Sequence, residues 1–209
     1  MAMLNQQQYK QYDFKLSGLD GISDKEIQVH LGLYAGYVKN TNLLNETIVR
    51  LGKDNKVGTP EWAEVTRRLA FEYDGMILHE YYFGNLKPNG GKLDPNSRLG
   101  QAIQQNFGTV EAWEADFKAI GSMRGVGWAI LFQDPMTGWL SNQWITLHQD
   151  GHPAGFKPIL VLDVWEHAFM VDYVPAERGK YIDAFFRNID WEAVENRLTQ
   201  EKAARPIGS

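Results

Sequence analysis

Apolar and polar residues alternate with a helical period over two long stretches in the first half of the chain. In residues 23–52 the apolar positions recur every three or four residues, and Ser23 followed by Glu26 has the pattern of a capping box. We expect a helix here that ends with the glycine closing the stretch. Residues 58–86 repeat the period, and Pro60 is typical of a first helical position. A short polar loop joins the two stretches, which predicts an antiparallel helical hairpin.

The pattern changes after a Pro-, Gly- and Asn-rich linker at about residues 87–97. Beyond it we expect two short helices, two strands joined by a turn, a third strand and closing helices: residues 94–108, 109–123, 125–150, 156–165 and 179–202. This order predicts an α+β fold. An N-terminal α-helical hairpin domain (residues 1–90) precedes an α/β domain with a three-stranded antiparallel sheet (residues 91–209). Residues 1–22 are polar, and we expect an extended lead-in.

Composition excludes several classes of protein. A net charge of −5 leaves no basic surface for phosphates, so no nucleic-acid partner is expected. The sequence has no cysteine, which excludes disulfides, zinc ribbons and thiol catalysis. No signal peptide and no apolar run of about 20 residues is visible, so we expect no membrane association and a cytoplasmic protein.

Histidines are few, and two of them lie in apolar helical stretches. The five are His30, His79, His148, His152 and His167. In an antiparallel hairpin His30 and His79 can face each other, and a tight turn after the third strand lets Asp163 and His167 converge. A buried histidine needs partners for both ring nitrogens, and a metal supplies one of them. Three imidazoles and one carboxylate suit a first-row transition metal.

The stretch DVWEHAF, from Asp163 to Phe169, resembles the motif of the iron/manganese superoxide dismutases, in which Asp, any residue, Trp, Glu, His, Ala and an aromatic residue follow one another. Further segments resemble that family in the family's order: YVKNTN, HEYYFGNL, GSMRGVGWAIL and YIDAFFRNIDWEAV. The resemblance covers about residues 23–200. It implies a helical hairpin followed by an α/β domain with a three-stranded antiparallel sheet, in agreement with the outline above.

The resemblance implies one manganese or iron ion per chain, bound by four residues: His30, His79, Asp163 and His167. In the family a glutamine contacts the solvent molecule on the metal. It comes from the sheet in manganese enzymes, where glycine stands four residues before the second ligand. Gly75 and Gln149 match that arrangement, so we expect manganese, with Gln149 as a catalytic residue on the second strand. His148 is the alternative for this role.

The gateway to the metal departs from the family. There, a histidine and a tyrosine follow the first ligand at intervals of four residues. Here those positions hold Tyr34 and Val38, whereas YVKNTN matches the family best if Tyr37 is the gateway tyrosine. Both Tyr34 and Tyr37 are therefore candidate catalytic residues. Met170 stands where the family has a tyrosine that contacts the gateway histidine, so both partners of that contact are replaced together.

The activity implied is metal-dependent dismutation of superoxide to dioxygen and hydrogen peroxide. Trp128 and Trp165 match aromatic residues that wall the metal. Glu166 matches a residue that reaches a ligand histidine of the other subunit, so we expect a homodimer or tetramer with Glu166 at the interface. Lys39 and Arg178 are candidates for attracting the anionic substrate. Two other functions stay open: a different metal-dependent redox activity on this scaffold, and a non-catalytic metal-binding paralogue.

Overall fold

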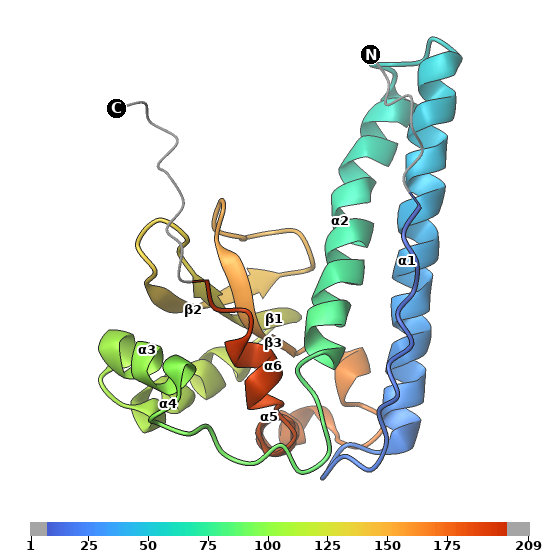
Figure 1. Cartoon of the computed structure of the whole chain (residues 1–209). Helices are drawn as coiled ribbons and strands as arrows, with labels where there is room; N and C mark the ends of the chain where they lie inside the picture. Colours follow the sequence, from blue (N-terminus) through green and yellow to red (C-terminus); the bar gives the residue numbers. More distant parts are fainter. Residues whose placement is uncertain (1–7, 200–209) are drawn as a thin grey trace, which may run out of the picture.

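A computed structural model describes residues 8–199 of the chain, and its elements follow the predicted order (Figure 1). The first half is a hairpin of two long helices, α1 (Asp24–Lys53) and α2 (Pro60–Phe83). The second half contains, in order, α3 (Arg98–Phe107), α4 (Val110–Gly121), β1 (Gly127–Gln133), β2 (Leu140–Thr146), β3 (Lys157–Asp163), the 3-10 helices η1 (Glu166–Ala168) and η2 (Pro175–Glu177), α5 (Arg178–Arg187) and α6 (Trp191–Glu195). The predicted α+β fold is confirmed.

Helix starts are set by side-chain caps. The hydroxyl of Ser23 accepts a hydrogen bond from the backbone N–H of Glu26, and that of Thr59 accepts one from Trp62. The capping box predicted at α1 is only half formed. The carboxylate of Glu26 turns inward and accepts the backbone N–H of Val171, 2.9 Å away, which ties α1 to the segment after η1.

The sheet is antiparallel with strand order β2-β1-β3. Every residue of the central strand β1 is buried, as expected for a strand covered on both faces. Trp128 pairs with Ile145 of β2 on one side and with Asp163 of β3 on the other. This register places the last residue of β3 beside the start of β1, at the edge of the sheet that faces the hairpin.

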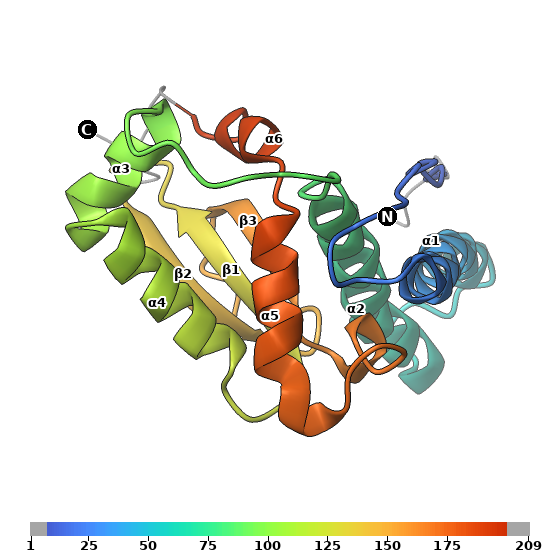
Figure 2. The ribbon, with the colours of Figure 1, turned by 90° about the horizontal axis from the view of Figure 1, so that it is seen from below.

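Helices close the sheet into one core. Seen from below, α4 and α5 lie across the sheet, while α1 and α2 are viewed nearly end-on beside it (Figure 2). Contacts join α4 to β1 and β2, and α2 to β3. The buried hydrophobic residues of the hairpin and of the sheet form a single cluster. The division into two domains near residue 90 stays a prediction, because the shared cluster gives no independent boundary.

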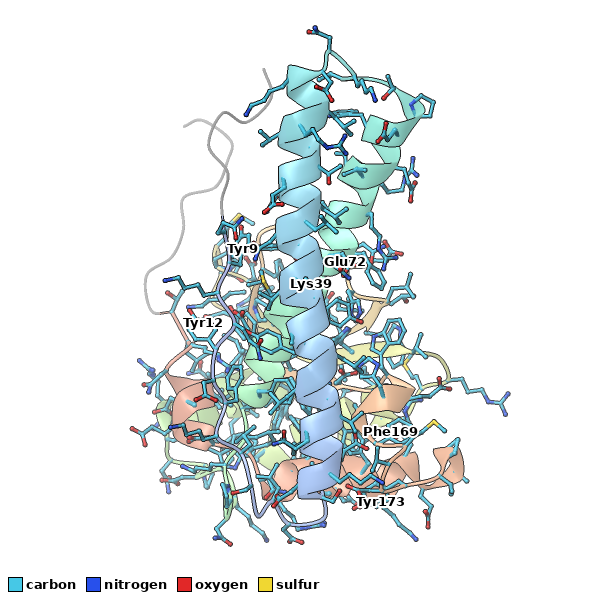
Figure 3. All side chains as sticks on the ribbon, turned by 90° about the vertical axis from the view of Figure 1, so that its right-hand side faces the viewer. Tyr9, Tyr12, Lys39, Glu72, Phe169 and Tyr173 are labelled. Carbon is cyan, nitrogen blue, oxygen red and sulfur yellow. The ribbon has the colours of Figure 1, made fainter. Side chains whose placement is uncertain are left out.

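The segment before α1 runs alongside the hairpin (Figure 3). The backbone N–H of Tyr9 donates to the side chain of Asn42, and that side chain donates back to the carbonyl of Tyr9. The rest of the predicted lead-in, residues 1–7, and the end of the predicted closing helices, residues 200–202, lie outside the described residues. Within residues 8–199, no helix combines the length and the apolar character that crossing a bilayer requires.

Candidate metal centre

Four side chains that are distant in the sequence meet between the hairpin and the sheet. His30 comes from the first half of α1, His79 from the last turns of α2, Asp163 from the end of β3 and His167 from η1. Their shared neighbour is Asp163 Oδ2. The Nε2 atoms lie 3.1, 3.2 and 3.7 Å from it in His30, His167 and His79. One donor atom from each of the four lies within 4.8 Å of the others, so a single ion could contact all of them.

The cluster is chemically incomplete without an ion. The side chains of His30, His79 and Asp163 are fully buried, and that of His167 is 20% exposed. Nε2 of His79 is buried and has no hydrogen-bond partner among the described residues. Leaving such an atom unsatisfied costs free energy in a folded core. A metal ion would satisfy it, and nitrogen and carboxylate donors suit manganese or iron.

Protonation states favour metal binding. Burial lowers the pKa of His30, and burial together with the neighbouring His30 lowers that of His79 further, so both rings are neutral near pH 7. Burial works against ionisation of Asp163. The charge of His167, and hydrogen bonds with His167 and His30, nevertheless hold the pKa of Asp163 well below its usual range. Neutral imidazoles and an ionised carboxylate are the forms that ligate metals. Burial opposes the charged form of His167, but the charge of Asp163 and its hydrogen bond outweigh burial and raise the pKa of His167, so this ring must release its proton when it binds a metal.

A hydrogen bond to the backbone fixes the ring orientation of His79. Its Nδ1 lies 2.6 Å from the backbone carbonyl of Gly75 and donates to it, so Nε2 carries the lone pair that faces Asp163. Gly75 also lets Tyr37 approach, because a Cβ at this position would lie 2.6 Å from a ring carbon of Tyr37. Any larger residue at position 75 would displace the tyrosine.

Asp163 is held by the backbone that follows it. The N–H of Trp165 donates to Oδ1 of Asp163 at 2.8 Å, which leaves Oδ2 for the cluster. The hydroxyl of Tyr181 donates to the carbonyl of Asp163 at 2.9 Å, and the N–H of Val164 donates to the carbonyl of Gly127. The end of β3 is therefore tied to both α5 and β1.

A hydrogen-bonded chain of three side chains borders the cluster. The indole N–H of Trp128 donates to Nδ1 of His148 at 3.1 Å, so Nδ1 is an acceptor. Burial lowers the pKa of His148 to about 4, and the neutral ring therefore carries its hydrogen on Nε2. That nitrogen lies 2.7 Å from the hydroxyl oxygen of Tyr37 and donates to it. The hydrogen of Tyr37 remains free to be donated elsewhere.

His148 reaches this position from a turn. Strand β2 ends at Thr146, and residues 147–149 form a turn in which Leu147 has a left-handed φ of 55°. The prediction that Gln149 lies on the second strand is therefore wrong. Oε1 of Gln149 is buried with no partner among the described residues, and it is His148, the alternative, that lies between Trp128 and Tyr37.

Comparisons with known proteins agree with this geometry. A family model described as iron/manganese superoxide dismutases, C-terminal domain, matches residues 95–197. An iron superoxide dismutase of Aquifex pyrophilus is 37% identical over 91% of this chain and 90% of its own length. The chain belongs to the iron/manganese superoxide dismutase family. A manganese superoxide dismutase of Haloferax volcanii is 36% identical over 80% of this chain and 81% of its own length. An iron superoxide dismutase of Cupriavidus metallidurans is 38% identical over 86% of this chain and 90% of its own length. The similar proteins of this family thus include both metals.

Of the two gateway candidates, Tyr37 packs directly on a ligand of the dismutase-family site. Its ring centroid lies 5.0 Å from that of His79. The hydroxyl of Tyr34 instead accepts the backbone N–H of Tyr12, at 3.0 Å, and donates to Glu80, at 2.9 Å. Tyr34 therefore fastens the segment before α1 to the hairpin. The sequence could not separate the two, because residues three apart share a helix face and the partner of Tyr34 comes from a distant segment.

Aromatic rings surround the ligands, as the family resemblance implied. The ring of Trp128 lies 5.1 Å from His79, and Trp165 stacks on both His167, at 5.7 Å, and His148, at 4.8 Å. Sequence reasoning missed Phe71, whose ring lies 4.5 Å from that of His148. The sequence feature that could have indicated Phe71 is its spacing from Gly75 and His79. Steps of four residues place Phe71 two helical turns before the ligand His79, on a neighbouring part of the surface of α2.

Glu166, which we expect at a subunit interface, and the nearby Met170 lie on the surface of the single chain. Glu166 is exposed, and Met170 is 50% exposed. Two exposed apolar residues of α1, Val29 and Leu33, flank the ligand His30 in sequence. Helix α1 contacts η1, so Val29 and Leu33 of α1 and Glu166 of η1 belong to neighbouring elements.

Proposed function

We propose that this protein dismutates superoxide, converting two superoxide anions and two protons into dioxygen and hydrogen peroxide. The observation that carries the proposal is the group of three imidazoles and one carboxylate around a single point, in which Nε2 of His79 has no hydrogen-bond partner within residues 8–199. Membership of the iron/manganese superoxide dismutase family supports it. When bound, the metal ion would supply the one-electron chemistry by alternating between its trivalent and divalent states.

The charge of the ligand set suits an anionic substrate. Asp163 would bring one negative charge, and the three histidines would bind as neutral rings, so the loaded site would keep a positive excess in either metal state. Trp128 and Trp165 place aromatic rings against His79 and His167 and reduce the water around the ligands. In a dry site the attraction between the ion and superoxide is less screened than in bulk solvent.

Protons are handled by Tyr37 and His148 in this proposal. His148 Nε2–H donates to the oxygen of Tyr37, so the hydroxyl hydrogen of Tyr37 is available to a reduced oxygen species beside His79. Burial and the charge of Asp163 raise the pKa of Tyr37, which keeps its proton in place at neutral pH. We assign His148, in place of Gln149, to the hydrogen-bonded chain beside the ligands, because His148 contacts both Trp128 and Tyr37.

One ion of manganese or iron is proposed for each chain. The preference for manganese rested on Gly75 together with Gln149 on the sheet, and the position of Gln149 in the turn removes half of that basis. Relatives of both kinds are similar to this chain. Activity after separate loading with each metal decides between them.

We also propose a homodimer with Glu166 in its interface, with a tetramer as the alternative assembly. The exposure of Glu166 beside the partly exposed His167, with the apolar Val29 and Leu33 on the neighbouring helix, supports this proposal. Molar mass in solution by light scattering tests the assembly state. The cytoplasmic location stays a prediction.

The ligand set and the activity are tested together. Purified protein loaded with manganese or with iron is expected to contain one ion per chain and to remove superoxide far faster than the free metal. His30→Ala is expected to lose the ion and the activity. His152→Ala removes a histidine outside the ligand set and serves as the control for metal content. Stoichiometric metal in His30→Ala would remove His30 from the ligand set.

A further inference from the structure

A cation lies on the solvent side of the Tyr37–His148 pair. Arg68 of α2 places its guanidinium carbon 3.9 Å from the centre of the Phe71 ring. The Phe71 ring in turn lies 4.5 Å from His148 and 6.2 Å from Tyr37, centroid to centroid. Arg68, Phe71, Tyr37 and His148 form what we call the entrance cluster, ordered from the surface towards the ligands.

The guanidinium is fixed in place by a buried partner. Nε and a terminal nitrogen of Arg68 both donate to Oε1 of Glu72, at 2.8 and 2.6 Å. Asn40 of α1 donates to the other oxygen of Glu72 at 3.3 Å. The side chain of Glu72 is 4% exposed, whereas that of Arg68 is 49% exposed. The ion pair is therefore oriented, with its negative end in the protein and its positive end in solvent.

The charge of Arg68 acts on Tyr37 and His148, the inner members of the entrance cluster. Burial sets the main shift in pKa for both Tyr37 and His148. In each case the positive charge of Arg68 adds a lowering contribution. A positive charge that acts on these two groups also acts on an anion arriving beside them.

The cations expected from the sequence are placed differently. The guanidinium of Arg178 donates to three backbone carbonyls, those of Met123, Gly125 and Val164, and so holds loops together. Lys39 is exposed on α1, and Figure 3 shows it near the level of Glu72 along the hairpin. Neither packs on a ring of the entrance cluster as Arg68 does.

We propose that Arg68 is a specificity-determining residue that draws small anions over Phe71 to the Tyr37–His148 pair. The inference rests on the proposed function, since superoxide is the anion it would attract. With a net charge of −5, the protein as a whole repels anions, and a local positive end at the mouth of the site offsets that repulsion. The stacked, paired guanidinium has a defined position, which a free lysine on the surface lacks.

Four variants of the full-length, metal-loaded protein test the proposal. Arg68→Met removes the charge, and Arg68→Lys keeps it. Arg67→Met is the matched control, because the neighbouring Arg67 is 73% exposed and pairs with Glu64 at the surface. Arg68→Met combined with Glu72→Leu avoids leaving a carboxylate buried without its partner. Metal content and melting temperature are measured first for each protein.

Two readouts follow. The first is kcat/KM for superoxide from about 10 mM to about 0.5 M salt, a range over which exposed charges become screened. The second is the dissociation constant of azide, an anion that binds metals, measured spectroscopically without turnover. Arg68→Met is expected to lower kcat/KM and weaken azide binding by about two- to threefold at low salt. The double variant is expected to lose as much, Arg68→Lys to retain most of both values, and the differences to vanish at high salt.

Specific results would overturn the inference. It fails if Arg68→Met matches Arg67→Met in both readouts at low salt, or if its loss persists at high salt. It also fails if the double variant recovers, since the loss would then come from the stranded Glu72. If the wild-type protein binds metal but does not dismutate superoxide, the proposed function fails, and azide binding alone still tests whether Arg68 attracts anions.

Discussion

The ligand set and the entrance cluster lie a few ångströms apart but are positioned by different means. Backbone groups orient the ligands: the carbonyl of Gly75 fixes His79, and the N–H of Trp165 fixes Asp163. In the entrance cluster, side chains hold one another, from Glu72 through Arg68 and Phe71 to His148. Changes among the ligands are therefore expected to abolish metal binding, whereas changes at the entrance are expected to alter rates around an intact centre.

The largest effect is expected from Asp163→Asn. It keeps the shape of the side chain and the acceptor for Trp165, but it removes the one anionic donor of the four. We expect the affinity for the metal to fall by more than about 100-fold, with loss of activity, measured by competition with a chelator. Asp183→Asn, on the exposed face of α5, is the control. Normal metal affinity in Asp163→Asn would remove the distinction between the two regions.

Next in size is the effect of Tyr37→Phe. The variant removes the hydroxyl to which His148 donates and leaves the ligands untouched. We expect full metal content and a fall in kcat of about 100-fold, the lower end of what a lost proton donor typically costs. Tyr34→Phe is the matched variant. It breaks contacts with Tyr12 and Glu80, so its stability falls by about 1 kcal/mol while kcat is kept. Equal loss of kcat in both variants would contradict the assignment of Tyr37.

The ligand set was accessible to prediction because it follows regular structure. Hydrophobic periodicity placed His30 and His79 on facing helices, and the end of an apolar strand placed Asp163. The motif through Phe169 then joined His167 to them. Each of these inferences uses the backbone of one element, and the structure places the four side chains together as the family resemblance implied.

The entrance could not be derived in the same way, for two physical reasons. The match to the family's glutamine selected Gln149 on an expected strand, whereas the strand ends at Thr146 and the left-handed φ of Leu147 turns the chain, so that His148 lies between Trp128 and Tyr37. Tyr34 and Tyr37 share a helix face, and only the hydrogen bond from the distant Tyr12 shows which one is engaged elsewhere. Contacts between segments that are distant in the sequence determine both positions, and no local sequence pattern predicts such contacts.

The smallest effect on activity is expected at Glu26, whose carboxylate joins α1 to the segment after η1. Glu26 is 1% exposed, and burial, opposed by the hydrogen bond from Val171, raises its pKa from 4.5 to about 7. The folded protein therefore binds a proton here that the unfolded chain releases above pH 4.5. Stability from this group is present at about pH 4.5 and is lost as the pH rises through 7.

Glu26→Gln removes this titration while keeping a side-chain oxygen for the N–H of Val171. Relative to wild type, we expect the variant to gain about 2 kcal/mol in free energy of unfolding between about pH 5 and about pH 8, measured by denaturant titration. Glu46→Gln makes the same charge change on the exposed side of α1 and serves as the matched control. Because Glu26 joins α1 to the segment after η1, and not to the entrance cluster, kcat is expected to stay within about twofold of wild type at neutral pH. A flat difference for Glu26→Gln would contradict the raised pKa of Glu26. A fall in kcat as large as that of Tyr37→Phe would mean that the backbone support of the ligands and the entrance are coupled.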